Sequence, residues 1–351
     1  MHHSANTFEW TIIGAGPAGI AAVGKLLDND IDPKKIAWID PHFSVGDFGT
    51  DWKNVSSNTR VKLFLQFYTA CQSFKYDAFS NEFEINHADP SKTCQLSLAA
   101  KPLFWITEHL KKTVVSIVDK AIQLKLHHRH WEVSLAKHEK IHSKNVVLAM
   151  GAEPKSLSFP PIEEISLKTA LDPEKLKTAV NKEDTVAVFG SSHSAMIIIK
   201  ALLEQCQIKK VINFYRDALR YAVQFPDWIL FDDTGLKGTT AEWSRENIDG
   251  QWPPKLERVI SNQDSLSEVL PLCQKAIYAV GFESRKISVE GLQSLAYNDR
   301  SGIIAPGLFG FGIGFPESKE DCFGTVEYRV GLWKFMEYIT RVLPVWLRYT
   351  S

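Results

Sequence analysis

Two segments of the chain share one hydrophobic pattern, in which a short apolar run leads into a small-residue turn and a helical stretch. Residues 10–13 are β-branched or aromatic, residues 14–19 read Gly-Ala-Gly-Pro-Ala-Gly, and small apolar residues continue to Leu27. Residues 36–40 then read Ile-Ala-Trp-Ile-Asp, which predicts a second buried strand that ends in an acid. The order strand, helix, strand predicts a β-α-β unit with parallel strands.

The same pattern returns in the middle of the chain. Residues 185–189 predict a buried strand, residues 190–195 read Gly-Ser-Ser-His-Ser-Ala, and a helical stretch covers 196–206 before the next strand at 211–215. Asp40 follows Gly14 at the same sequence distance as Arg216 follows Gly190. An acid at the end of the second strand suits an unmodified ribose, whereas an arginine suits a 2′-phosphate. The two copies therefore predict sites for two different dinucleotides.

Each position of the first turn has a physical role in holding a dinucleotide. The first glycine permits a tight turn, the second lets the backbone approach a pyrophosphate, and the third lets the helix pack closely on the strand. The N–H groups at the start of the helix attract the phosphates. The predicted cofactor contacts of this copy are Gly14, Gly16, Pro17, Ala18, Gly19 and Asp40.

The second turn departs from the glycine pattern. Ser192 puts a side chain where a pyrophosphate would approach, and Ala195 stands at the packing position. The copy is either a working NAD(P) site or an inactive structural repeat, and Asp217 dilutes the positive charge of its neighbour Arg216. His193 either hydrogen-bonds the cofactor or caps the helix that it begins. The predicted contacts are Gly190, Ser192, His193, Ser194, Ala195 and Arg216.

Composition excludes several classes of protein. A chain of 351 residues with 44% hydrophobic and 23% charged residues is an ordinary globular protein of about two domains. Its net charge of −1 gives no basic face, so we expect no nucleic-acid partner. No apolar run reaches the roughly 18 residues of a spanning helix, and no signal-peptide pattern is visible. Five scattered cysteines without a CxxC pair fit reduced thiols, so we expect a cytoplasmic protein without stable membrane insertion.

The histidine cluster at 127–130 raises the question of a metal site, but the surrounding sequence does not support one. Alternating apolar residues flank the cluster between Ile122 and Leu135, which predicts a β-hairpin with a polar tip. No carboxylate or cysteine is spaced to complete a ligand set. We therefore predict no metal site.

In this order the motifs resemble the flavoproteins with two dinucleotide-binding domains, a group that includes the pyridine nucleotide-disulfide oxidoreductases and the flavin monooxygenases. Residues 145–151 and 275–282 resemble the two strands at which such chains cross between domains, and residues 307–314 resemble the late turn that closes over the flavin. Residues 46–52 resemble the glycine and tryptophan segment that packs along the flavin. The resemblance adds these cofactor contacts: Gly49, Trp52, Gly151, Gly281 and Gly310.

The resemblance implies an α/β fold with two Rossmann-like domains. An NAD(P)-binding domain at 152–281 would be inserted into an FAD-binding domain that is formed by 1–151 and 282–351 and carries a small antiparallel β-meander. Apolar residues at helical spacing over 326–349 predict a final helix, which either packs on the flavin domain or meets a membrane surface or a partner. The implied cofactors are FAD and NADPH, with NADH as the alternative.

Two features favour the monooxygenase branch. No compact cysteine pair is present for disulfide reduction, and residues 55–62 resemble the segment whose asparagine lies beside the reactive edge of the flavin. By this resemblance Asn58 would be that asparagine, and its amide could donate a hydrogen bond where charge develops; the alternative is a plain Asn-Thr turn. Residues 179–189 lack the glycine, histidine and tryptophan fingerprint of Baeyer–Villiger enzymes, which favours oxidation of a heteroatom.

The sequence leaves three functions open. The first is an FAD enzyme that takes hydride from NADPH and oxidises a nitrogen or sulfur of a small molecule. The second is an NAD(P)H reductase of a quinone, a flavin or a protein partner, and the third is a flavin-binding sensor without turnover. Residues 221–260, rich in aromatics and turn residues, are a lid or substrate wall, a plain excursion, or an oligomer contact. The sequence fixes neither the substrate nor the oligomeric state.

Overall fold

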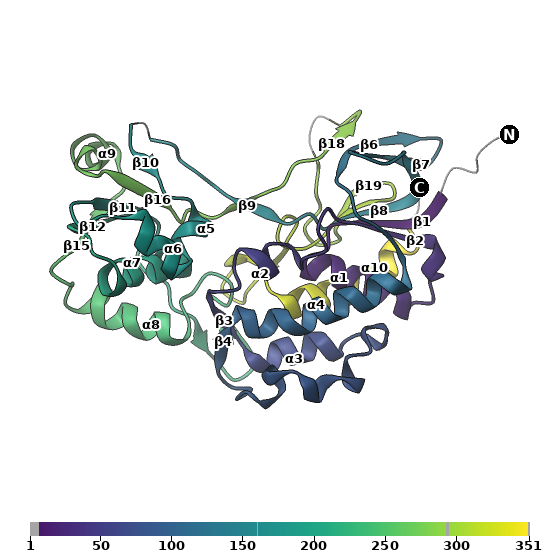
Figure 1. The fold of residues 1–351 in the computed structure, drawn as a ribbon, viewed down its shortest axis with the longest axis horizontal. Coiled ribbons are helices and arrows are strands. Elements are labelled where there is room, and N and C mark those ends of the chain that lie inside the picture. The colour runs from purple at the N-terminus through teal and green to yellow at the C-terminus, as the bar shows by residue number, and fades with distance from the viewer. Residues whose placement is uncertain (1–6, 160, 293–294, 350–351) are drawn as a thin grey trace. The chain divides into compact units, whose positions relative to one another are not determined.

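The computed structural model describes residues 7–159, 161–292 and 295–349, and the chain divides into two compact units. Figure 1 labels many of the helices and strands of both. The first unit contains Met1–Lys53, Thr59–Ala152 and Ser284–Ser351, and the second contains Asn54–Asn58 and Glu153–Glu283. Each unit is built on a sheet with a parallel centre, so the predicted α/β class with two Rossmann-like halves is confirmed.

Nine strands form the main sheet of the first unit, counted over the described residues. Its parallel centre has the order β20, β8, β1, β2, β5, and the register places Ile12 beside Trp38 on one side and Val147 on the other. These strands are β1 (Thr7–Ile13), β2 (Ile36–Ile39), β5 (Val115–Ile117), β8 (Ile141–Leu148) and β20 (Leu308–Gly310), with β18 (Ser288–Glu290) beside β6 and β19 (Ile303–Ala305) beside β20.

An antiparallel meander extends this sheet. β6 (Ala121–His127) pairs with β7 (His130–Leu135), which pairs with β8. His128 and Arg129 form the hairpin turn in the left-handed conformation, with φ of 47° and 65°. The primed turn matches the right-handed twist of the two strands. The predicted hairpin with a polar tip is therefore confirmed.

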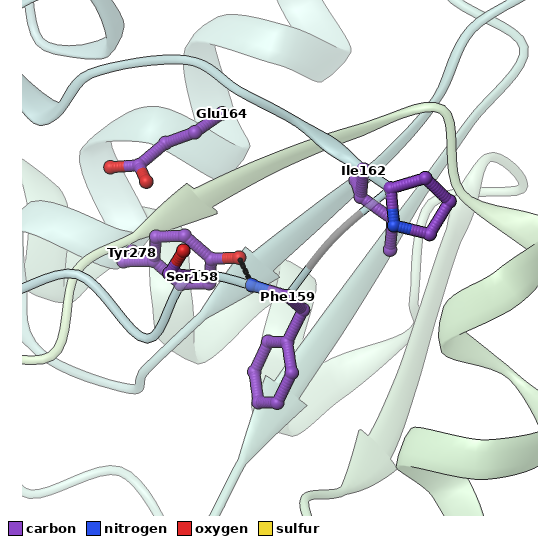
Figure 2. A pocket seen from close by; sticks show the side chains of 6 residues that line it. Ser158, Phe159, Ile162, Glu164 and Tyr278 are labelled. Carbon is purple, nitrogen blue, oxygen red and sulfur yellow. Dashed lines mark hydrogen bonds between the residues drawn. The ribbon is translucent and has the colours of Figure 1, made fainter.

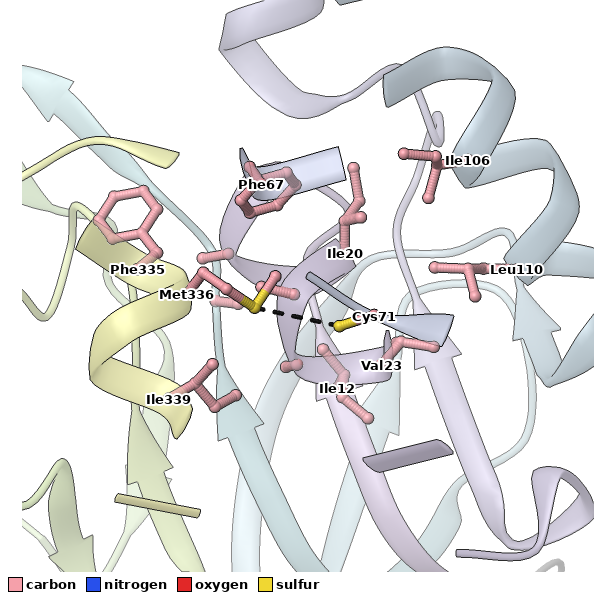
Figure 3. Close-up of a cluster of buried hydrophobic side chains, with 14 of the residues drawn as sticks. Ile12, Ile20, Val23, Phe67, Cys71, Ile106, Leu110, Phe335, Met336 and Ile339 are labelled. Atoms are coloured by element: carbon pink, nitrogen blue, oxygen red, sulfur yellow. Dashed lines mark hydrogen bonds between the residues drawn. The ribbon is translucent and has the colours of Figure 1, made fainter. Parts of the chain in front are cut away.

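Four longer helices belong to the first unit. They are α1 (Pro17–Asp28), α3 (Val61–Thr69), α4 (Leu96–Thr113) and α10 (Leu332–Trp346), and α3 packs on α10 and α4. Figure 3 shows Ile12 of β1 packed with side chains from α1 and α10, where the thiol of Cys71 lies 4.0 Å from the sulfur of Met336. The same stretches of chain also contain the short helix α2 (Gly46–Thr50) and the strands β3 (Ser56–Arg60), β4 (Thr93–Gln95), β21 (Glu317–Glu320) and β22 (Val326–Arg329). The first residues of β3 belong to the second unit.

The final helix is shorter than the sequence pattern predicts. Residues 326–329 form β22, which pairs with β21, and α10 begins only at Leu332. Val326 and Tyr328 alternate with Glu327 and Arg329, and this period of two outweighs the helical spacing further on. α10 packs against α1 and α3 through its buried face, as the first of the two alternatives expects. Within the described residues, no helix has the length and apolar character needed to cross a membrane.

The second unit has a five-stranded parallel sheet in the order β10, β16, β11, β12, β15. Its strands are β10 (Glu163–Glu164), β11 (Thr185–Phe189), β12 (Lys210–Tyr215), β15 (Leu256–Ile260) and β16 (Lys275–Tyr278), and its helices are α5 (Leu167–Ala170), α6 (Pro173–Ala179), α7 (His193–Gln205), α8 (Gly238–Ser244) and α9 (Gln263–Glu268). Short strands β9 (Ala152–Pro154) and β17 (Phe282–Ser284) pair where the chain enters and leaves this part.

The 221–260 segment contains short helices and strands. It contains the small hairpin of β13 (Val223–Gln224) and β14 (Ile229–Leu230), helix α8, a π-helical turn at Arg245–Gly250, and the edge strand β15. The buried side chains of Ala241, Trp243 and Ile248 attach it to the unit. Among its aromatic residues, Trp243 is buried whereas Phe225 and Trp252 are exposed, so packing accounts for only part of this aromatic content.

We predict that Gly19→Ala destabilises the first unit and that Gly16→Ala does not. A Cβ on Gly19 would overlap the carbonyl oxygen of Gly14, a backbone atom that cannot move without disturbing β1. The expected loss in free energy of unfolding is about 1–3 kcal/mol, the usual range for overpacking. A Cβ on Gly16 would meet only the carbonyl oxygen of Val45, at 3.9 Å. Urea unfolding followed by tryptophan fluorescence measures both variants, and equal losses would contradict the close-packing argument.

Candidate functional site

The first glycine turn is held at the carboxyl ends of three parallel strands. Gly14 has a φ of 112°, and a Cβ there would overlap the carbonyl oxygen of Ala149 just after β8. Its N–H donates to the carbonyl of Ile39 (2.8 Å), and its own carbonyl accepts from the indole N–H of Trp38 (2.9 Å). Only glycine meets both demands, the positive φ and the close approach.

The start of α1 leaves room beside its free N–H groups. Gly16 is the N-cap and makes no side-chain cap, and Pro17 fills the first helical position, where a missing N–H does no harm. The N–H groups of the first helical turn, which include Ala18 and Gly19, have no acceptor within the helix. Because a Cβ at Gly16 would enter nearly open space, a phosphate can approach the backbone there. The turn thus fits the pyrophosphate of a dinucleotide.

Asp40 is half-buried and braces this turn. Its Oδ2 accepts from the N–H of Ala15 (2.8 Å), and its Oδ1 accepts from the N–H groups of His42 (2.8 Å) and Phe43 (2.7 Å). A carboxylate has about four acceptor sites, so these donors leave about one for a ribose hydroxyl. The acid predicted from sequence is in place, and most of its hydrogen-bonding capacity shapes the backbone.

A left-handed corner follows Asp40 and returns the chain to the turn. Phe43, Val45 and Gly46 have φ of 51°, 61° and 57°. Val45 is fully buried, and a β-branched residue at positive φ is strained, so the surrounding packing must hold it there. A Cβ on Gly46 would lie 3.2 Å from the Cα of Gly16. The start of α2 is thereby set against the first turn.

Gly49, Trp52 and Gly310 have local packing roles that the sequence did not reveal. A Cβ on Gly49 would overlap the carbonyl oxygen of Ser44 and would lie 2.8 Å from the ring of Phe104. Trp52 is half-buried, and its backbone N–H donates to the backbone carbonyl of Asp47 (3.0 Å). A Cβ on Gly310 would lie 2.5 Å from the ring of Phe315. At Gly49 and Gly310, close packing therefore requires glycine independently of any cofactor.

An ion pair between distant segments joins α2 to the end of β8. The guanidinium of Arg285 donates to both carboxylate oxygens of Asp47 (2.9 and 2.7 Å) and to the carbonyl of Met150 (3.1 Å). It lies beside Gly151, whose φ is 77°. Gly312 is also close to the first turn, because a Cβ there would lie 2.5 Å from the Cβ of Ala18. Sequence reasoning missed Asp47, Arg285 and the role of Gly312, since no local pattern connects residues so far apart.

The second turn has the same backbone arrangement as the first. Gly190 has a φ of 115°, its N–H donates to the carbonyl of Phe214 (2.8 Å), and a Cβ there would overlap the carbonyl oxygen of Ala279. Ser192 is the N-cap of α7, and its hydroxyl donates to that same Ala279 carbonyl (3.4 Å). The hydroxyl thus has an acceptor on the neighbouring strand end. Ser194 and Ala195 both lie in the first turn of α7, and Ala195 is fully buried at the packing position.

The strand registers correct one inference from spacing. Gly14 bonds to Ile39 and Gly190 bonds to Phe214, so the residues that follow, Asp40 and Tyr215, are structurally equivalent. Arg216 is exposed and lies one residue beyond that position. Equal sequence spacing does not mean equal position here, because the second copy reaches the strand end one residue sooner. An uncharged tyrosine stands where the first unit has its carboxylate.

His193 begins α7 but does not cap it through its side chain. Both ring nitrogens are buried, and neither has a hydrogen-bond partner among the described residues. A buried polar group without a partner loses its hydration without compensation. The helix-capping alternative for His193 is therefore wrong, and the ring is held next to the turn with its nitrogens unsatisfied.

Asn58 is exposed on β3, in the segment 54–58 that belongs to the second unit. The amide of Asn54 donates to the carboxylate of Asp172 (3.1 Å), the N-cap residue of α6, which ties the segment to this unit. Gly281 has a φ of 98°, and a Cβ there would meet no atom within 4 Å. Gly281 is therefore required by its backbone conformation alone.

A hollow of about 210 Å³ also lies in the second unit, and the residues of the glycine turn do not line it. Figure 2 shows that the hydroxyl of Tyr278 accepts a hydrogen bond from the N–H of Phe159 there (3.2 Å). Its walls come from Ser158, Phe159, Pro161, Ile162, Glu164 and Tyr278. It has no cation and no glycine turn, so it does not suit a phosphate. The described residues also contain no group of three or more His, Cys, Asp or Glu side chains that could hold a metal ion.

Comparison with known proteins agrees with this architecture. Residues 8–279 match the family of the pyridine nucleotide-disulphide oxidoreductases. The monooxygenase AgnR1 of Paecilomyces divaricatus is 34% identical over an alignment of 385 residues. The alignment covers 96% of this chain and 97% of that protein.

Solved structures share the fold at low sequence identity. The ornithine N-hydroxylase of Kutzneria sp. 744 superposes with a TM-score of 0.67 at 13% identity, covering 97% of this chain and 99% of the other. A flavin-containing monooxygenase from Stenotrophomonas maltophilia gives 0.65 at 13%, covering 98% and 99%. Thioredoxin reductase of Lactococcus lactis gives 0.58 at 13%, covering 97% and 98%.

The paired glycine turns, the sheet order and the match over most of the chain lead to one assignment. The protein is an FAD-dependent oxidoreductase. It belongs to the family of the pyridine nucleotide-disulphide oxidoreductases, in the branch of the flavin monooxygenases.

Proposed function

We propose that the protein is an NADPH-dependent monooxygenase that oxidises a nitrogen or sulfur atom of a small molecule. The observation that carries the proposal is the pair of matched turns. In the first unit Asp40 follows the second strand, whereas in the second unit Tyr215 ends the corresponding strand and Arg216 follows it. The likeness to the monooxygenase AgnR1 supports the use of oxygen. The absence of a Baeyer–Villiger fingerprint in residues 179–189 supports a heteroatom as the target.

The first unit is the proposed FAD site. The N–H groups at the start of α1 would hold the pyrophosphate, with Gly16 giving access and Asp40 accepting from the ribose. When bound, FAD accepts hydride from a nicotinamide and passes electrons to oxygen. The chain itself supplies a rigid binding surface, because the ion pair between Arg285 and Asp47 holds α2 next to the turn.

The second unit is the proposed NADPH site. The N–H groups at the start of α7 would bind the pyrophosphate, and Arg216 would bind the 2′-phosphate. Tyr215 supports this choice, because a carboxylate at the same place would repel the phosphate. Arg220 adds a second exposed guanidinium four residues on, with no acidic partner among the described side chains. In the sequence, these two exposed arginines stand on either side of the single acid Asp217.

Asn58 is the proposed catalytic residue of the oxygenase reaction. Its amide can donate a hydrogen bond to negative charge that develops on oxygen, or to the nicotinamide. A neutral amide keeps this donor at every physiological pH. Removing it would leave hydride transfer intact and would lower the share of electrons that reach the substrate.

Anaerobic reduction tests the proposed function. The purified, FAD-loaded protein is mixed with NADPH in the absence of oxygen while the flavin absorption band is recorded. We expect rapid bleaching by NADPH and slower bleaching by NADH. A flavin that stays yellow with both would overturn the assignment of the second turn.

The same preparation then tests the oxygenase step. When oxygen is admitted, Asn58→Ala should release more hydrogen peroxide per NADPH consumed than the wild type does in the presence of an oxidisable amine or thioether. Asn58→Ser, which keeps a small donor, should lie between the two. Equal peroxide yields in all three would remove Asn58 from the reaction, and bleaching without any oxygenated product would favour a reductase.

Arg216→Ala should separate the two nicotinamide cofactors. We expect NADPH affinity to fall about tenfold or more, because one charge-assisted contact with the 2′-phosphate is lost, and NADH affinity to change less than twofold. Titration calorimetry measures both. The control is Lys182→Ala, which removes an exposed cation just before β11, at the opposite end of the strands. Equal losses for the two cofactors would refute the phosphate role.

His193 makes the stability of the second unit depend on pH. Burial, aided by the charge of Lys237, lowers the pKa of His193 from 6.5 to about 4. The unfolded chain therefore binds a proton between about pH 6.5 and 4 that the folded chain does not, so stability falls as the pH drops through this window.

We predict that His193→Asn flattens this pH dependence. The wild type should lose up to about 3 kcal/mol between pH 6.5 and 4 that the variant keeps, a figure that follows from about 1.36 kcal/mol per pKa unit. Urea unfolding at several pH values measures the difference. Parallel pH profiles for the two proteins would show that His193 titrates normally.

A further inference from the structure

A buried relay in the second unit connects the glycine turn to an arginine that the proposed site does not use. The amide of Asn213, fully buried on β12, donates to the carbonyls of Val188 (2.9 Å) and Gly190 (2.8 Å). Its Oδ1 accepts from the Nε–H of Arg258 on β15 (2.9 Å). Asn213 and Arg258 are register partners on adjacent strands, so their side chains share one face of the sheet.

The first unit holds the same turn carbonyl by a different side chain. There the indole N–H of Trp38 donates to the carbonyl of Gly14 (2.9 Å). Trp38 and Asn213 are equivalent, because each precedes the strand residue whose carbonyl accepts from the turn glycine. The indole has only a donor and needs no further control. An amide has a donor end and an acceptor end, so it needs a partner that decides which end faces the carbonyls.

Arg258 is the partner that fixes the orientation of the Asn213 amide. A guanidinium only donates, so it can bond only to the oxygen end of the amide and thereby directs the NH₂ end toward Gly190 and Val188. Its central carbon lies 4.2 Å from the ring centre of Tyr215, the strand-end residue next to Arg216. One guanidinium is therefore connected to both ends of the proposed nucleotide site, the turn and the strand end.

The arginine has no ion-pair partner in the described part of the unit. Its Nη2 is buried without a hydrogen-bond acceptor, and the nearby carboxylate of Asp249 accepts instead from the hydroxyl of Tyr221 (2.6 Å). Arg258 is half-buried, and burying one of its N–H donors without an acceptor is unfavourable for stability alone. This arrangement favours a role in positioning over a role in stability.

We propose that Arg258 is a positioning residue for NADPH, which fixes the second turn through Asn213 and the strand end through Tyr215 without touching the cofactor. The inference rests on the proposed function of the second unit. It explains how a turn with Ser192 and Ala195 in place of two glycines keeps its N–H groups aimed at a pyrophosphate. A turn held in its bound conformation binds more tightly, because less freedom is lost on binding.

The test compares two arginines of the same cluster. Arg258→Met keeps an unbranched apolar stem and removes the donor to Asn213. We expect NADPH and NADH affinities to fall together, each about tenfold, with the FAD content unchanged. Hydrogen exchange of the FAD-loaded protein without nicotinamide should be faster in residues 188–196, a readout that needs no turnover.

Arg245→Met is the matched control. Arg245 also stacks on a tyrosine, 4.3 Å from the ring centre of Tyr221, and carries the same charge. Among the described residues, no hydrogen bond connects it to the turn. We expect it to leave NADH affinity within twofold and hydrogen exchange at 188–196 unchanged. An equal effect of both substitutions would overturn the relay, because it would mean that the charge of the cluster acts at long range.

Two further outcomes decide the proposal. If Arg258→Met weakens NADPH and spares NADH, Arg258 contacts the 2′-phosphate directly and the relay is refuted. Asn213→Asp keeps the size and the acceptor for Arg258 but removes the donors to Gly190, so it should reproduce the loss for both cofactors; unchanged affinities would also refute the relay. If the wild type binds neither nucleotide, the proposed function fails, and the exchange rates at 188–196 still decide whether the relay holds the turn.

Discussion

Both units depend on one steric constraint, the approach of a turn glycine to the carbonyl oxygen that ends a neighbouring parallel strand. Ala149 in the first unit and Ala279 in the second place that oxygen where a Cβ would have to be. The glycine N–H then bonds to the opposite strand, so the turn is held from both sides. This close approach brings the start of a helix to the carboxyl edge of the sheet, where its free N–H groups can meet a phosphate. Every other part of each site is arranged around that point.

The constraint is local, and this explains what the sequence could predict. Gly14 and Gly190 each follow a short apolar strand and precede a helix, so a few adjacent residues identify the turn and the parallel pairing around it. Asp40 is predictable for the same reason, because it ends the next strand. The hairpin at 128–129 also follows from alternation around a polar tip. In all of these the deciding contacts lie within one β-α-β unit or one hairpin.

Residues that act across elements gave no such signal. Arg285 reaches Asp47 through the fold, and Arg258 reaches Asn213 through the register of two strands. Counting residues also failed at the strand end. The strand residue that bonds to the turn glycine lies 25 residues after Gly14 but only 24 after Gly190, so Tyr215 and not Arg216 is the equivalent of Asp40. Such positions follow from pairing in three dimensions and not from sequence distance.

The packing position shows why the two turns need different supports. In the first unit a Cβ on Gly19 would overlap the carbonyl oxygen of Gly14, so helix and turn are in direct contact and each restrains the other. The second unit accommodates the methyl group of Ala195, so the carbonyl of Gly190 cannot make the same close contact with its helix. Two donors from Asn213 hold the strand end and that carbonyl instead, and the orientation of the amide depends on Arg258. A hydrogen-bond relay can thus replace a steric contact, provided that its last donor is itself fixed by packing, as the guanidinium is on the ring of Tyr215.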